Sequence, residues 1–471
     1  MGVVTIQDTD FLLDPYPDIN SRRGASIRRA VAVLFTVLFT VLAAVGTSRA
    51  QSALADRLMD RGFENVRVRT LPDTESDRRL GPQSGPLPGT PSDTLLLSFE
   101  YRMARGSHAG VCEALKLAGS GYAHVVTILE HQNVPMTAVA FDGAPRSRPD
   151  LLADPAISGR ADSSSVRRGP VALDAQVAAQ VPQRCGGYRI AGASMDVRPY
   201  VRQLESGHHA SRPLIDVALH PRYSALFGFY RDPVMLQVNL APRLNVRLWR
   251  GFEVGAQIVV PLYNEFSSEG DFIRPGLLTA SQFIRLPGPT FVRATAGTYT
   301  NRRFGLDLRA RRFFADGRFW AGFDVGRTGN VFYPNGSVFV ERDPEWIVLG
   351  TAGFAWSRHH LYVDGAAGRF LFGDAGGRVE IMRQFRRLDL GFVFTQTVNG
   401  ANAGLRLILP LFEGSFAGSR SLRVRPAHDF TWDYLYRAGT NVGEAYETGY
   451  YMDRVYRQHQ PSFLMDLLTT P

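Results

Sequence analysis

The sequence contains little lysine and little cysteine, and both shortages limit its chemistry. Lys116 is the single lysine among 53 basic residues, so arginine carries the formal net charge of +9. The arginine fork favours carboxylate and phosphate partners, although genomic base composition also explains such a bias. Cys112 and Cys185 are the two cysteines, and no Cys/His cluster has the spacing of a zinc site. We therefore expect no metal and no cofactor.

Motifs of the common enzyme classes are also missing. The sequence has no P-loop, no GxGxxG after a strand, no HExxH and no GxSxG. The His-His pairs at 208–209 and 359–360 have no third ligand spaced nearby, so exposed loops explain them better than metal sites. Asp364 and Asp389 could form a carboxylate pair for hydrolysis, but neutralisation of nearby arginines is the simpler interpretation. We expect no enzymatic activity, with a hydrolase as the minor alternative.

An uncharged apolar run occupies residues 30–45 and follows four arginines between residues 22 and 29. Ser48-Arg49-Ala50 then supplies small residues where signal peptidase cleaves. Residues 1–50 are therefore predicted to be a signal peptide with an N-terminal extension, cleaved after Ala50. A retained anchor is the weaker alternative, because a spanning helix needs about 20 apolar residues. No later segment is apolar over that length, so membrane residence after export would require a closed barrel.

Residues 51–141 alternate between helical and strand patterns. A helix is predicted from Gln51 to Arg61, and Ser107 is a suitable N-cap for a second helix that ends before Gly119. Strands are predicted at 66–69, 94–102, 123–129 and 136–141. This alternation predicts a small α/β domain, which we place in the periplasm.

Residues 142–212 are predicted to be a linker and loop region. The segment up to residue 187 is rich in Pro, Arg, Asp and Ser, a composition typical of linkers. Cys112 lies in the second predicted helix and Cys185 lies at the far end of this segment. An oxidising compartment would permit a disulfide between them, and the geometry of the fold decides whether it forms.

The clearest local pattern is a hairpin at residues 304–325. Phe304, Leu306, Leu308 and Ala310 alternate with glycine and charged residues, and the alternation restarts at Phe319 after an Ala-Asp-Gly turn. Period-two alternation on both sides of an Asp-Gly turn predicts a β-hairpin. The apolar face would form the core of a soluble sandwich, or it would face lipid in a membrane barrel.

Segments of this kind recur throughout residues 213–412. There are roughly a dozen, most about 8–12 residues long, which matches a strand that crosses a bilayer. Strands of a soluble β-sandwich average about 5–6 residues, so the lengths favour the barrel. We predict a mainly β fold with a C-terminal antiparallel outer-membrane β-barrel of roughly 12–14 strands. Residues 413–471 are predicted to be a final strand and a tail that includes a periplasmic helix.

The polar faces of these segments carry many charges. Residues predicted to line the barrel lumen are Arg293, Arg303, Asp307, Arg309, Arg311, Arg318, Asp324, Asp364, Asp389 and Arg406. Rings of mixed charge tune the passage of charged polymers, and arginine selects anionic groups. The simpler alternative is a salt-bridge lattice that stiffens the barrel, and the two interpretations are compatible.

Several short strings together resemble YjbH-type proteins, which belong to exopolysaccharide and capsule operons of Gram-negative bacteria. They are Gly62-Phe63-Glu64-Asn65-Val66, Phe99-Glu100-Tyr101-Arg102, Asn301-Arg302-Arg303-Phe304-Gly305, Tyr362-Val363-Asp364-Gly365, Gly368-Arg369-Phe370, Gly373-Asp374-Ala375-Gly376-Gly377, Arg383-Gln384-Phe385, Ile408-Leu409-Pro410-Leu411 and Arg423-Val424-Arg425-Pro426. The resemblance covers most of residues 51–440. It implies an outer-membrane barrel with a periplasmic domain, and it brings no catalytic residues.

The resemblance sets the functional expectation. It implies a protein that helps exopolysaccharide or capsule cross or assemble at the outer membrane. The partners would be outer-membrane lipid, exopolysaccharide and other polysaccharide-export proteins, and an exported chain has no use for nucleic acid. A general porin or a structural outer-membrane protein is the alternative, because only the resemblance points to a sugar.

Overall fold

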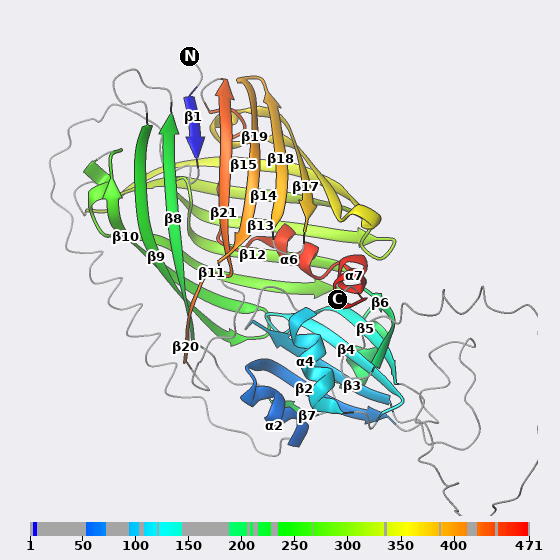
Figure 1. Cartoon of the computed structure of the whole chain (residues 1–471). Helices are drawn as coiled ribbons and strands as arrows, with labels where there is room; N and C mark the ends of the chain where they lie inside the picture. The colour runs from blue at the N-terminus through cyan, green and yellow to red at the C-terminus, as the bar shows by residue number, and fades with distance from the viewer. Residues whose placement is uncertain are drawn as a thin grey trace, which may run out of the picture.

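The structure is a computed structural model of the whole chain (Figure 1). It describes residues 3–6, 53–71, 94–102, 108–119, 122–143, 188–204, 208–210, 215–227, 234–266, 268–333, 337–385, 388–411, 422–438 and 441–469. The predicted cleavage site at Ala50 lies outside these residues. Cys185 also lies outside them, so its pairing with Cys112 stays a prediction. Cys112 itself lies in helix α4 (His108–Ala118).

The protein is mainly β, and its larger sheet has 15 strands. In hydrogen-bonded order these are β1 (Val3–Ile6), β21 (Asp429–Ala438), β19 (Gly400–Pro410), β18 (Asp389–Thr397), β17 (Ala375–Gln384), β16 (Leu361–Arg369), β15 (Phe339–Trp356), β14 (Phe319–Phe332), β13 (Arg303–Phe314), β12 (Thr290–Tyr299), β11 (Arg274–Leu286), β10 (Phe252–Asn264), β9 (Val234–Trp249), β8 (Ile215–Phe227) and β20 (Leu422–Pro426). From β8 to β19 each strand is antiparallel to the next along the chain.

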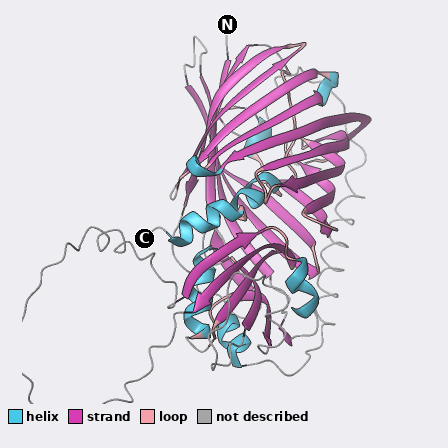
Figure 2. Ribbon diagram, turned by 90° about the vertical axis from the view of Figure 1, so that its right-hand side faces the viewer, coloured by secondary structure: helices cyan, strands magenta, loops and turns pink. Residues whose placement is uncertain are grey.

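The two ends of this sheet meet at β1. This four-residue strand pairs antiparallel with β21 on one side and with β8 on the other. Because β1 is antiparallel to both, β8 and β21 run in the same direction. Further along β8, the short strand β20 pairs with it in parallel. Figures 1 and 2 show that the large sheet is strongly curved.

The predicted hairpin is present as β13 and β14. Phe314 pairs with Phe319 across the turn, and seven residues further from the turn Asp307 pairs with Gly326. Ala315, Asp316 and Gly317 all have positive φ angles, a conformation that Gly and Asp adopt more readily than most residues. The structure therefore confirms the Ala-Asp-Gly turn that the sequence predicts.

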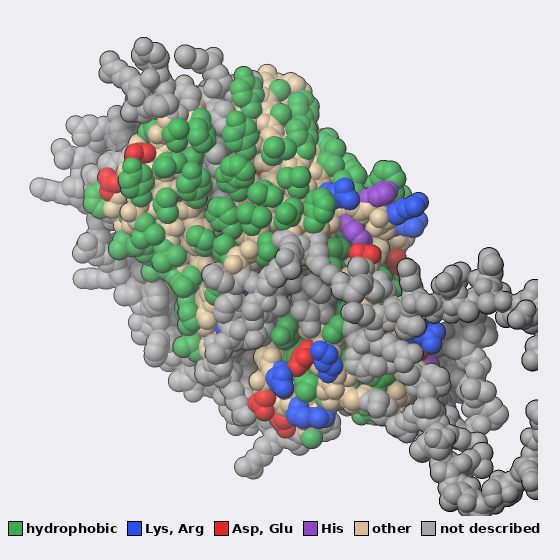
Figure 3. All heavy atoms as spheres, in the orientation of Figure 1, with side chains coloured by type: hydrophobic (Ala, Val, Ile, Leu, Met, Phe, Trp, Pro, Cys, Tyr) green, Lys and Arg blue, Asp and Glu red, His purple; other side chains and the backbone are tan. Residues whose placement is uncertain are grey.

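The polarity of the large sheet is the reverse of that of a water-soluble protein. Along β18, Leu390, Phe392 and Phe394 are exposed, whereas Asp389 and Thr395 are buried. On β13, the side chain of Leu306 is 65% exposed. On the face seen in Figure 3, hydrophobic side chains cover most of the described part of the large sheet, and charged groups lie over the smaller sheet and at the right-hand edge of the large one.

The smaller sheet has six strands. Their order is β6 (Tyr188–Ser194), β5 (Val134–Gly143), β4 (His124–His131), β3 (Thr94–Tyr101), β2 (Phe63–Leu71) and β7 (His208–Ala210). The helices near it are α2 (Ala53–Asp60), α4 and α5 (Arg198–Leu204). β3 and β4 are parallel and joined through α4, as a βαβ unit requires. Its core is conventional, because Leu97, Phe99 and Val125 are buried apolar residues.

This smaller sheet extends beyond the predicted boundary at residue 141. β6 pairs with β5, and β7 pairs with β2, so part of the predicted linker belongs to the sheet. The C-terminal helix α7 (Pro461–Thr469) also joins its core through Leu464 and Leu468. Pairing between strands so far apart in the chain leaves no pattern in the local sequence. The boundary predicted at residue 141 is therefore too early.

Short helices complete the described structure. Helix α6 (Met452–Gln458) precedes α7, and Figures 1 and 2 place both between the large sheet and the smaller one. Three single-turn 3₁₀ helices, η1 (Ser268–Asp271), η3 (Ser357–His359) and η4 (Leu371–Gly373), lie between strands of the large sheet. The final strand predicted after residue 412 is present as β21.

Candidate functional site

The buried face of the large sheet holds most of the predicted lumen charges, and it holds them as ion pairs. Arg311 of β13 donates two hydrogen bonds to Asp324 of β14, at 2.6 and 3.1 Å. Arg309 donates to Asp307, two residues earlier on the same strand, at 3.1 Å. Residues two apart on a strand share a face. The same alternation that exposes Leu306 therefore buries these charges.

Arg406 of β19 is at the centre of a second cluster of charges, which lies several strands away from β13 in the large sheet. Its guanidinium donates to both carboxylate oxygens of Asp433, at 2.8 and 3.0 Å, and to Glu380 at 2.8 Å. Arg406 and Asp433 are register partners in β19 and β21. Bidentate pairing of this kind fixes side-chain geometry as well as charge.

Asp364 and Asp389 are both on strands of the large sheet. Asp364 accepts a hydrogen bond from Trp320 Nε1 at 3.0 Å, and Arg457 lies 3.5 Å from its carboxylate. Asp389 is buried at the start of β18. The partners of Asp364 fit charge neutralisation better than a pair of catalytic carboxylates.

Three of the predicted arginines differ in their surroundings. Arg303 is fully buried and lies 2.8 Å from Glu345. Arg293 is equally buried, but its contacts are with neutral groups, as described below. Arg318 is exposed in the turn before β14, so it does not belong to the buried face. The alternation placed Arg318 with Trp320 and Asp324, but the strand begins one residue later.

The C-terminal tail, residues 441–469, crosses the buried face of the large sheet. Its main-chain groups bond to sheet side chains, with Asn402 donating to Val442 O at 3.0 Å and Arg243 donating to Gly449 O at 2.8 Å. The Glu447 N–H donates to Thr300 Oγ1 at 2.7 Å. These contacts involve residues from β19 to β9, so the tail runs across most of the strands on the buried face of the large sheet.

Tyr446 anchors the tail through both its ring and its hydroxyl. Its ring stacks on Tyr299 with centroids 4.9 Å apart, and its hydroxyl donates to Asp307 at 3.0 Å. A Cβ added at Gly326 would overlap the Tyr446 hydroxyl. Gly326 therefore makes room for the tail, a role that no sequence pattern reveals.

Charged contacts also join the smaller sheet to the large one. Arg247 of β9 lies 2.7 Å from Glu100 and 2.8 Å from Glu64, both on the smaller sheet. Arg423 of β20 reaches Glu64 at 2.9 Å. Gln132, after β4, donates to Glu253 of β10 at 3.1 Å.

Two titratable groups of the smaller sheet are strongly perturbed at this junction. Burial would raise the pKa of Glu100, but the charges of Arg102 and Arg247 outweigh it and hold that pKa far below its ordinary value. Burial lowers the pKa of His131 well below its ordinary value, against the opposing charge of Glu100. Glu100 is therefore ionised and His131 neutral at physiological pH.

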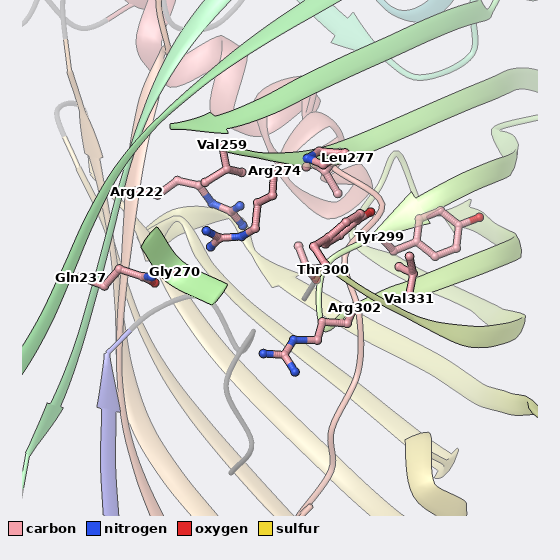
Figure 4. Close-up of a pocket in the computed structure, with 13 residues that line it drawn as sticks. Arg222, Gln237, Val259, Gly270, Arg274, Leu277, Tyr299, Thr300, Arg302 and Val331 are labelled. Atoms are coloured by element: carbon pink, nitrogen blue, oxygen red, sulfur yellow. The ribbon is translucent and has the colours of Figure 1, made fainter. Parts of the chain in front are cut away.

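A large cavity lies at this junction, and a smaller one is lined by residues of the large sheet. The larger, about 320 Å³, is bounded by the smaller sheet, the tail and strands near β8 to β12. The smaller, about 50 Å³, is lined by Arg222, Arg274, Arg302 and Tyr299, and none of its described lining residues is acidic. Figure 4 shows the guanidinium groups of Arg222 and Arg274 directed toward each other. Arg222 lines both cavities.

Comparison with known proteins finds no matching family model, no similar curated protein and no similar solved structure. Within the described residues, no helix combines the length and apolar character that crossing a membrane requires. Nor do three His, Cys, Asp or Glu residues of that part of the chain lie together as metal ligands would.

Sequence reasoning missed the contribution of the tail. The tail tyrosines and the large cavity that they border were not among the predicted site residues. The tyrosine-rich composition of residues 446–456 was the available signal, because tyrosine combines an apolar ring with a hydroxyl that a polar interior can bond.

Proposed function

We propose that the large sheet is a β-barrel in the outer membrane and that the smaller sheet lies on its periplasmic side. The observation that carries this proposal is the inverted polarity of strands such as β18, with Phe392 and Phe394 outside and Asp389 inside. In water, exposing a continuous apolar surface of this extent would drive association. In a bilayer the same surface is solvated by lipid.

Pairing at the seam supports a barrel in the full chain. β1 bonds to β8 and β21, and a sheet whose two edges are joined has no open edge at that point. Val3–Ile6 lies within the segment predicted to be removed after Ala50. The mature protein would then bring the parallel strands β8 and β21 together, or receive another strand between them.

We further propose that the barrel assists export or assembly of exopolysaccharide. The resemblance to YjbH-type proteins and the arginine-rich interior support this role. A general porin is less well supported, because the tail crosses the buried face of the large sheet, along which diffusing solutes would have to pass. A purely structural role is the second candidate, favoured by the ion-pair lattice around Arg311 and Arg406.

The first test is localisation of the expressed full chain. Outer-membrane recovery, with a band that shifts on boiling before electrophoresis, is the expected result for a closed barrel. Recovery as a soluble periplasmic protein would overturn the proposal, and the large sheet would then be a soluble scaffold.

The second test separates a plugged export barrel from a structural one. Replacing Gly326 with valine should displace Tyr446 and raise the conductance of the protein in planar bilayers, whereas the wild type should conduct little. Gly350 offers a matched control on the neighbouring strand, because a Cβ added there meets nothing closer than 3.8 Å. Equal conductance of all three proteins would favour the structural role.

A further inference from the structure

Two buried arginines, one on β9 and one on β12, lie around one tyrosine of the tail. The guanidinium carbon of Arg243 is 4.8 Å from the ring centroid of Tyr450, and that of Arg293 is 4.7 Å from it. The residues are 6% and 1% exposed. Contacts with an aromatic ring offset part of the charge, but the ring carries no formal charge.

Neither arginine has a carboxylate partner among the described residues. Arg243 bonds to the carbonyl of Gly449, and its Nε and Nη2 atoms have no hydrogen-bond partner. Arg293 contacts Ser281, Gln132, His131 and the sulfur of Met452, all of them neutral or weak acceptors. A buried charge without a counter-charge is strongly unfavourable, so these two differ from the paired arginines of the interior.

Both arginines line the cavity of about 320 Å³, together with Arg222. That volume is at the lower end of the range for small-molecule sites. The acidic groups that line the same cavity already face other arginines. Glu100 lies 2.7 Å from Arg102, Glu130 lies 2.9 Å from Arg67, and Asp429 lies 3.2 Å from Arg454. Glu253 lies 3.6 Å from both Arg102 and Arg247. The cavity therefore has an excess of positive charge on the side formed by the large sheet.

We propose that this cavity binds the anionic group of an acidic saccharide, and that Arg243 and Arg293 are the residues that bind it. The guanidinium fork matches the two oxygens of a carboxylate. That the ligand is a saccharide rests on the proposed function, whereas its negative charge follows from the cavity. Because Tyr450 contacts both guanidinium groups, a ligand and the tail share the same two residues, and binding displaces or reorients the tail.

The test uses the full chain, purified in detergent, and measures binding by calorimetry. The probes are digalacturonic acid, the neutral disaccharide galactobiose and inorganic phosphate. Digalacturonic acid should bind, and galactobiose should bind at least about tenfold more weakly, since one charge-assisted hydrogen bond is worth about that factor. Arg243→Gln and Arg293→Gln should each weaken digalacturonic acid binding by at least about tenfold.

Arg318→Gln is the matched control, because that arginine is exposed in a turn and should bind digalacturonic acid like the wild type. Each variant is checked for its heat-dependent shift, and Arg243→Lys, which keeps the charge, replaces Arg243→Gln if that protein does not fold. Equal binding of the acidic and neutral disaccharides would overturn the proposal, as would binding of phosphate alone. Binding by the purified protein does not depend on where the protein resides in the cell. Failure of the localisation test and failure of the binding test can therefore be told apart.

Discussion

The central strands of the smaller sheet bury both of their faces, whereas the strands of the large sheet bury a polar face and expose an apolar one. In the smaller sheet, Phe99 is fully buried and packs edge-on against Phe63 at 5.0 Å. In the large sheet, Leu306 is 65% exposed while the adjacent Asp307 is 4% exposed. Strand periodicity decides which residues share a face, but the surroundings decide which face is buried. Each of the following predictions tests that difference.

The largest effect is expected from removing a core ring of the smaller sheet. Phe99→Ala should lower the free energy of unfolding by about 4 kcal/mol, because it removes buried surface and leaves a cavity. Phe392→Ala on the exposed face of the large sheet should lower it by about 2 kcal/mol, since lipid fills the space and only the transfer energy is lost. Urea unfolding in lipid vesicles measures both. No effect of Phe392→Ala would indicate that this face contacts water.

Breaking a buried ion pair should come next. Arg311→Met leaves Asp324 without its bidentate partner and should cost about 3 kcal/mol of unfolding free energy. The double variant Arg311→Met with Asp324→Asn should regain most of that loss, because no uncompensated charge remains. The double-mutant cycle is measured by the same unfolding assay. Losses that simply add would show that the two residues do not interact.

A charge on the outward face should have a somewhat smaller effect. Leu306→Arg should destabilise a membrane barrel by about 2 kcal/mol in lipid. On a surface that faces water, the same substitution should change stability by less than about 0.5 kcal/mol. Comparing unfolding in vesicles with unfolding in a soluble preparation distinguishes the two environments.

The smallest effect concerns acid pH at the junction of the sheets. The pKa of Glu100 and that of His131 are both lowered in the folded protein. Each group therefore contributes fully to the free energy of unfolding when the pH is above its ordinary pKa, and this contribution is lost as the pH falls. The loss should begin below about pH 6.5 with His131 and continue below about pH 4.3 with Glu100. Burial raises the pKa of Glu130, which opposes this trend.

Hydrogen exchange of β4 and β5 as a function of pH measures the effect. His131→Asn should remove the upper part of the pH dependence and Glu100→Gln the lower part. A variant of Glu113, on the outer side of α4, is the control and should leave the profile unchanged. An unchanged profile in both test variants would mean that other groups control this junction.

The sequence predicted the parts of the fold that depend on neighbouring residues. The alternation of Phe304 to Val325 and its Asp-Gly turn specify a hairpin locally, and β13 and β14 confirm it. It did not reveal that β6 and β7 complete the smaller sheet, because those pairings are long-range. The charged residues that it grouped lie on the less exposed face of the large sheet, except Arg318, which is exposed in a turn. That this face lines a lumen stays a prediction. The contacts of Tyr446 and Tyr450 depend on how the tail crosses the sheet, and residues such as Gly326 show their purpose only in three dimensions.

The tail follows the last strand of the large sheet directly, and this covalent connection has a kinetic and thermodynamic consequence. A segment tethered so closely experiences its binding surface at an effective concentration in the millimolar range or above. A free peptide with the same residues would compete poorly, and weakening a single contact would leave the tail bound most of the time. A ligand would therefore have to take over several of these contacts at once to shift the tail population appreciably.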